Sequence, residues 1–181
     1  MSSGMWALLV VVGLAALAAW LYNRLVADRN LVRQGFADID VQLKRRADLV
    51  PRLVEAVRAY AAHEKALLTS VAELRAAAIA APRLAERFGH ERQLGEALGK
   101  VVLLQENYPA LKADANFRQL STELVAIEDA LQYARRFYNG AVKQYLTRRE
   151  TFPDVLVARP FGFQPMPFFE TTDREAVKVA L

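Results

Sequence analysis

The first part of the chain is an uninterrupted apolar run. Between Met5 and Tyr22 no side chain is charged, and as an α-helix these 18 residues would extend about 27 Å, close to the ~30 Å hydrocarbon core of a bilayer. Trp6 and Trp20 lie towards the ends of the run with Tyr22, where aromatic rings prefer the membrane interface. The pattern predicts one transmembrane helix within residues 1–23.

A cleaved signal peptide is the alternative interpretation of this run. Ala16-Leu17-Ala18 resembles a cleavage site, but no Lys or Arg precedes Trp6, whereas a signal peptide begins with a basic region. We therefore favour a retained span. Because Arg24, Arg29 and Arg33 follow the run, the positive-inside rule predicts an external N-terminus and places residues 24–181 in the cytoplasm.

Residues 24–152 carry apolar side chains at helical spacing. The longest seam, from Phe117 to Tyr145, alternates by three and four residues. Pro51, Pro82 and Pro109 divide this part into four stretches, since proline disfavours helix at the residue before it. The predicted fold is all-α: a transmembrane helix continuous with an antiparallel, up-and-down four-helix bundle over residues 24–152. Around Pro51 the chain either turns or kinks a longer helix, and we expect a turn.

The C-terminal segment has a different composition. Residues 153–181 contain four of the seven prolines and, with Phe152 just before them, five of the nine phenylalanines. This is too much proline for a helix, so an extended aromatic arm is predicted. The arm either packs over one end of its own bundle or docks on a neighbouring subunit or the membrane face.

Composition limits the chemistry. Cysteine is absent, which excludes disulfides and thiolate chemistry, and only His63 and His90 are available as imidazole ligands. His63-Glu64 begins like a zinc-protease motif, but the second histidine is missing at Leu67. The net charge is +4, but the basic residues are interspersed with acidic ones, and no nucleic-acid recognition motif is present. We expect no enzymatic activity, cofactor, metal, small-molecule substrate or nucleic-acid partner.

Polar strings on the predicted helices are candidate interaction sites. Straight helix from Arg24 would place Lys44-Arg45-Arg46 roughly 30 Å from the membrane surface, well beyond a ~8 Å Debye length, whereas Arg24 could contact headgroups. The candidate interaction residues are Asp40, Gln42, Lys44, Arg45, Arg46, Arg135, Arg136, Tyr138, Asn139, Phe161, Phe163, Phe168 and Phe169. The candidate membrane-interface residues are Trp6, Trp20, Tyr22 and Arg24.

Several strings together resemble the bacterial LemA family. The most specific are IDVQLKRRADLVP at residues 39–51 and ARRFYN at 134–139, with YPALKAD at 108–114, and the similarity extends over about residues 20–170. Three departures are Gly35-Phe36 where the family commonly has Ala-Trp, Ile127 in place of a usual Thr, and Tyr145-Leu146 in place of a second Tyr-Asn. Gly35 should weaken its helix by up to ~1 kcal/mol relative to Ala.

The resemblance implies a single-pass protein of the bacterial cytoplasmic membrane with a tiny external N-terminus and a cytoplasmic four-helix bundle. It supplies no catalytic residue, cofactor or substrate. The leading hypothesis is a membrane-anchored helical scaffold that forms homo-oligomers and organises the bilayer or a membrane-protein partner. The alternative is an adaptor or regulator of a membrane protease or an envelope-stress signalling system. An enzyme is the third hypothesis.

Overall fold

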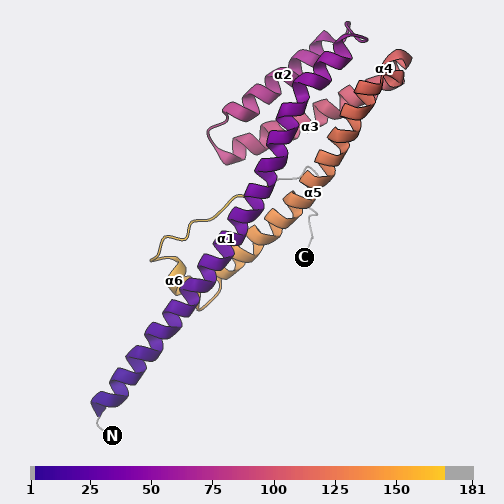
Figure 1. Cartoon of the computed structure of the whole chain (residues 1–181). Coiled ribbons are helices and arrows are strands. Elements are labelled where there is room, and N and C mark those ends of the chain that lie inside the picture. The colour runs from indigo at the N-terminus through magenta and orange to yellow at the C-terminus, as the bar shows by residue number, and fades with distance from the viewer. Residues whose placement is uncertain (1–2, 170–181) are drawn as a thin grey trace, which may run out of the picture. The chain divides into compact units, whose positions relative to one another are not determined.

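The computed structural model describes residues 3–169, and these contain helices without any β-strand (Figure 1). The elements are α1 (Ser3–Arg58), α2 (Lys65–Ala80), α3 (Leu84–Leu103), the 3-10 helix η1 (Leu104–Glu106), α4 (Pro109–Ala113), α5 (Ala115–Glu150) and α6 (Val155–Ala158). This confirms the all-α prediction, while the up-and-down bundle and its predicted boundaries stay predictions.

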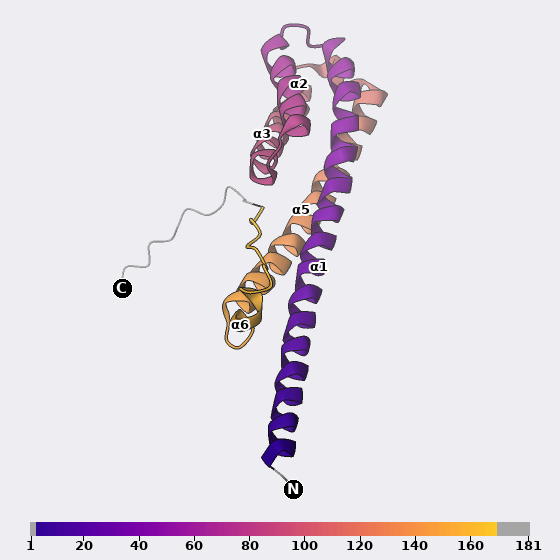
Figure 2. The ribbon, with the colours of Figure 1, turned by 90° about the vertical axis from the view of Figure 1, so that its left-hand side faces the viewer.

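The chain divides into two compact units. The first combines residues up to Ala37 with Arg136–Phe168, and the second combines Asp38–Arg135 with Phe169. Helices α1 and α5 each contribute to both units, so each unit contains segments that are far apart in sequence. In the first unit the C-terminal half of α5 lies beside α1, as Figures 1 and 2 both show.

The apolar run forms the beginning of α1. Every described residue up to Trp20 is exposed, and the first buried residue of the helix is Leu21. This part of the helix is long and apolar enough to cross a membrane, and only 6% of its most apolar window is buried within the chain. An apolar surface of this size needs a non-aqueous environment or a partner to cover it.

The turn expected at Pro51 is wrong, because α1 continues through this residue to Arg58. Proline has no N–H and therefore leaves the carbonyl of Ala47, four residues earlier, without its helical donor. The Nε of Arg75 in α2 donates a hydrogen bond to this carbonyl over 2.6 Å. A side chain from another helix thus supplies the bond that proline removes, and the helix does not end.

Substitution of Arg75 tests this account of Pro51. Arg75→Leu should destabilise the full-length protein by about 1–2 kcal/mol, the usual cost of an unsatisfied carbonyl. In a Pro51→Ala background, the N–H of Ala at 51 can bond the carbonyl of Ala47, so the same substitution should cost much less. Urea unfolding in mild detergent, followed by circular dichroism, would measure both differences. Equal costs in the two backgrounds would contradict the account.

The core of the second unit lies among α1, α2, α3 and α5. Leu53 and Val57 of α1 pack with Leu98 of α3 and with Phe117 and Leu120 of α5, all fully or almost fully buried. Helices α2 and α3 lie side by side in Figures 1 and 2. The loop between them contains Pro82, as the proline pattern predicted.

Helix α5 begins just after Asp114, whose side chain caps its N-terminus. The N–H of Phe117 donates to Oδ1 of Asp114 over 2.7 Å, and the hydroxyl of Tyr60 donates to Oδ2 over 2.9 Å. These bonds to the charged form hold the pKa of Asp114 below its usual value. The seam predicted along α5 is also confirmed, since Phe117, Leu131 and Tyr145 are fully buried.

Candidate interaction and membrane-facing sites

The candidate membrane-interface residues flank the exposed apolar part of α1. Trp6 and Trp20 expose more than half of their surface, and Tyr22 exposes 37%. The guanidinium of Arg24 lies 4.4 Å from the ring centroid of Trp20, and this stacking covers the apolar face of the cation. Tyr22 makes edge contacts with Phe161 and Phe163, with centroid distances of 5.2 and 5.6 Å.

A buried acid lies just after the apolar run. Asp28 is only 4% exposed, and its Oδ2 lies 2.9 Å from Nη1 of Arg148. Its Oδ1 accepts a hydrogen bond from Nε2 of Gln144 over 2.8 Å. Sequence reasoning missed this residue, although it occupies a seam position between the buried residues Leu25 and Val32. The ion pair joins α1 to the end of α5 within the first unit.

A second buried charge organises the other unit. Arg46 is completely buried, and its Nη1 donates to Glu128 of α5 over 2.6 Å. Its Nη2 forms an ion pair with the carboxylate of Glu91 in α3 and donates to the Glu91 carbonyl over 2.8 Å. A side chain at Gly95 would crowd this guanidinium, because a Cβ there would lie 3.1 Å from Nη1. We name Arg46, Glu91 and Glu128 the ionic cluster.

Arg135 belongs to the electrostatic surroundings of this cluster. Burial lowers the pKa of Arg135, and the positive charge of Arg46 lowers it further, while Glu128 and Glu91 act in the opposite direction. Its guanidinium lies 4.5 Å from the ring centroid of Phe169, which in turn packs on Phe88 at 4.0 Å. Of the candidate residues, the structure therefore brings Arg46, Arg135 and Phe169 into one region.

The segment after α6 runs along α5 without helical structure of its own. The hydroxyls of Tyr138 and Tyr145 donate to the carbonyls of Pro167 and Gln164 over 2.7 and 2.8 Å. Nε of Arg149 donates to the carbonyl of Phe163 over 2.7 Å. Burial raises the pKa of Tyr138 to about 12, so its hydroxyl remains protonated and able to donate. Residues 170–181 of the predicted arm lie outside the described part of the chain.

The remaining candidates lie at or near the surface. Lys44, Arg45, Arg136, Phe161 and Phe168 are exposed, whereas Phe163 and Phe169 are buried. The carboxylate of Asp40 pairs with Arg87 over 2.7 Å. Gln42 and Asn139 are half-buried, and the side-chain oxygen of Gln42 is buried with no hydrogen-bond partner in the described part of the chain.

The model of the LemA family matches residues 35–181, more than half of the chain. The chain belongs to the LemA family. Among curated relatives, magnetosome protein MamQ 2 of Paramagnetospirillum magneticum is 23% identical over 188 residues, covering 90% of this chain and 69% of its own. MamQ 1 of the same organism gives the same values. Protein LemA of Metamycoplasma hominis is 24% identical over 159 residues, covering 87% of this chain and 72% of its own.

Membership and structure agree on the broad character of this LemA protein. Its exposed apolar helix together with its family indicates a single-pass membrane protein. The names of these three relatives state no reaction. Within residues 3–169, no group of three or more His, Asp or Glu side chains is placed to hold a metal ion. The ionic cluster and the Asp28 pair instead connect helices to one another.

Proposed function

We propose that this LemA protein is a non-enzymatic, membrane-anchored helical scaffold that self-associates and organises the bilayer or partner proteins. The observation that carries the proposal is the continuity of α1. A single helix of 56 residues, about 84 Å long at 1.5 Å per residue, includes both the exposed apolar segment and core residues of the second unit. Such a helix joins the anchor to folded protein without an intervening loop.

We further propose that the protein resides in the bacterial cytoplasmic membrane with its N-terminus outside. The support for this orientation is the charge pattern of α1. Arg24, Arg29 and Arg33 follow the apolar segment, and the positive-inside rule assigns such residues to the cytoplasmic side.

The exposed members of the candidate set are proposed as contact residues between copies. Lys44 and Arg45 are exposed on α1 in the second unit, near the half-buried Asp40. Self-complementary contacts in homo-oligomers can use the same mixed-charge patch on both subunits. Arg46 is different, because its charge is already paired within the chain.

Charge reversal at Arg45 tests self-association. We expect the full-length protein in mild detergent to form a discrete oligomer, and Arg45→Glu to reduce its mass toward that of a 20.3 kDa chain with unchanged helix content. Arg33→Glu is the matched control, since Arg33 is also an exposed arginine of α1 but lies outside the candidate set. Light scattering of the detergent complex and circular dichroism supply the two readouts.

The mass of the unmodified protein decides between the proposed role and its alternative. A monomer in every mild detergent would overturn self-association and favour an adaptor of a membrane protease or an envelope-stress signalling system. That adaptor should then capture one foreign partner in stoichiometric amount. An oligomer whose mass is insensitive to Arg45→Glu would remove Arg45 as a contact.

A further inference from the structure

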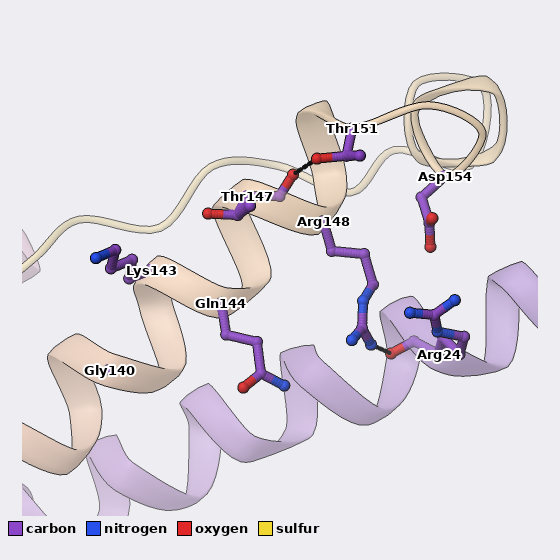
Figure 3. A pocket seen from close by; sticks show the side chains of 8 residues that line it. All are labelled: Arg24, Gly140, Lys143, Gln144, Thr147, Arg148, Thr151 and Asp154. Carbon is purple, nitrogen blue, oxygen red and sulfur yellow. Dashed lines mark hydrogen bonds between the residues drawn. The ribbon is translucent and has the colours of Figure 1, made fainter.

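A polar pocket lies directly beyond the apolar segment of α1. It has a volume of about 450 Å³ and is lined by Arg24 of α1, by Lys143, Thr147 and Arg148 of α5, and by Asp154 just before α6 (Figure 3). All of these residues belong to the first unit. The volume lies in the range typical of small-molecule sites, about 300–1,000 Å³.

With the apolar segment of α1 in a bilayer, the pocket lies near the level of the lipid headgroups. Arg24 is two residues after Tyr22, an axial distance of about 3 Å in a helix. The carbonyl of Arg24 also accepts a hydrogen bond of 3.5 Å from Arg148, so the end of α5 reaches the same level. Phe152 and Leu156, on either side of Asp154, expose 74% and 63% of their surfaces. Exposed apolar side chains close in sequence to a charged pocket residue fit a boundary between hydrocarbon and water.

The positive charges in the pocket differ in availability. Arg148 is already paired with Asp28. Lys143 is exposed, and Arg24 is half-buried with one face against Trp20, which leaves the N–H groups at the guanidinium edge able to donate. Arg24 therefore offers a charged donor to an anion, and phosphate oxygens accept strongly from such a donor, whereas Figure 3 draws Lys143 at the opposite end of the pocket.

Asp154 adds a negative charge to the pocket, and this charge favours a ligand with a positive group. This residue is only 4% exposed, and its Oδ1 is buried with no hydrogen-bond partner among residues 3–169. Figure 3 shows its carboxylate directed toward the side of the pocket that holds Arg24. A buried, unpartnered carboxylate is costly unless a donor or a positive charge joins it. A purely anionic ligand would increase this cost.

We propose that this pocket binds a phospholipid headgroup that carries both a phosphate and a primary ammonium group. Arg24 receives the phosphate, and Asp154 receives the ammonium group. A primary ammonium donates to Oδ1 and also compensates its charge, whereas a quaternary ammonium cannot donate and a glycerol hydroxyl carries no charge. The site rests on the membrane anchoring in the proposed function, but it does not depend on self-association.

The fluorescence of Trp20 would report binding directly. The chain contains two tryptophans, so Trp6→Phe leaves only Trp20, whose ring stacks with Arg24. Full-length Trp6→Phe protein in mild detergent would be titrated with short-chain phosphatidylethanolamine, phosphatidylcholine or phosphatidylglycerol. We expect phosphatidylethanolamine to bind about tenfold more tightly than either of the others. Tighter binding of phosphatidylglycerol would overturn the role of Asp154.

Asp154→Asn should abolish the preference for phosphatidylethanolamine over phosphatidylcholine. Asp48→Asn is the matched control, because Asp48 is exposed and distant in sequence from the pocket residues, and it should keep the tenfold preference. A preference that survives Asp154→Asn would contradict the proposal. Circular dichroism would verify that each variant retains its helix content.

Arg24→Gln keeps the proposal testable if Asp154→Asn does not fold. This variant should bind phosphatidylethanolamine and phosphatidylcholine several-fold more weakly, and unchanged binding would remove the phosphate site. Free O-phosphoethanolamine distinguishes the source of the headgroup. If it binds as tightly as phosphatidylethanolamine, the pocket binds a soluble ligand, and the assignment to a lipid is wrong. The oligomer mass is measured separately, so failure here is distinguishable from failure of the scaffold proposal.

Discussion

Arg46→Ala should destabilise the full-length protein by about 3–5 kcal/mol, the usual cost of removing one partner from a buried ion pair. The carboxylate of Glu91 is only 4% exposed, and the substitution removes the cation that pairs with it. It also removes the bond between Arg46 and the Glu91 carbonyl. Urea unfolding in mild detergent, followed by circular dichroism, would measure the loss.

The adjacent residue provides the control for this effect. Arg45 is exposed on the same helix, and Arg45→Ala should change the free energy of unfolding by no more than about 0.5 kcal/mol. A triple variant, Arg46→Met with Glu91→Leu and Glu128→Gln, removes the buried charges together. Because apolar replacement of a whole buried ion cluster is often neutral or stabilising, it should recover most of the lost stability. Arg46→Ala stability equal to that of Arg45→Ala would refute a structural role for the cluster.

Gly35→Leu should cost about 3 kcal/mol, at the upper end of the range for overpacking. At Gly35, helix α1 packs closely against α5 within the first unit. A Cβ on Gly35 would lie 2.9 Å from Cδ1 of Phe137 and 3.0 Å from the Cα of Tyr138. The Phe137 ring could rotate away, but the backbone of Tyr138 could move only with its helix. A branched side chain therefore has no space without separation of the two helices.

Smaller substitutions separate crowding from helix propensity. Gly99 lies within α3 with no atom inside 4 Å of an added Cβ, so Gly99→Ala should stabilise by up to about 1 kcal/mol. Gly35→Ala gains the same propensity but crowds Tyr138, and its net effect should be near zero. If Gly35→Leu is as stable as Gly35→Ala in thermal unfolding, the close approach does not constrain the helices.

Periodicity predicted most of the helical fold because it depends on local spacing. The uncharged residues before Arg24 and the seam of α5 both follow from residues close together in sequence. Pro51 was misinterpreted because the compensating donor, Arg75, is 24 residues away and belongs to another helix. No local pattern contains that information.

In the candidate sites, too, local sequence predicts some features, and others depend on residues that are distant in sequence. Arg45 and Arg46 are identical neighbours in sequence, yet one is exposed and the other completely buried. The distinguishing signal is the α1 seam, in which Arg46 follows the buried Leu43 by three residues, as Asp28 follows Leu25. A charge at a seam position indicates a buried partner, but only the fold identifies Glu91, Glu128 and Arg148 as the partners.

The ionic cluster can form only after its last member, Glu128, has been synthesised. Arg46 emerges from the ribosome before Glu91 and is separated from Glu128 by 82 residues. At about 5–20 residues per second, the last partner follows Arg46 by about 4–16 s. During this interval the N-terminal apolar segment has already been made, while the guanidinium that will join three helices is still hydrated. Membrane insertion can therefore begin well before the second unit is able to close.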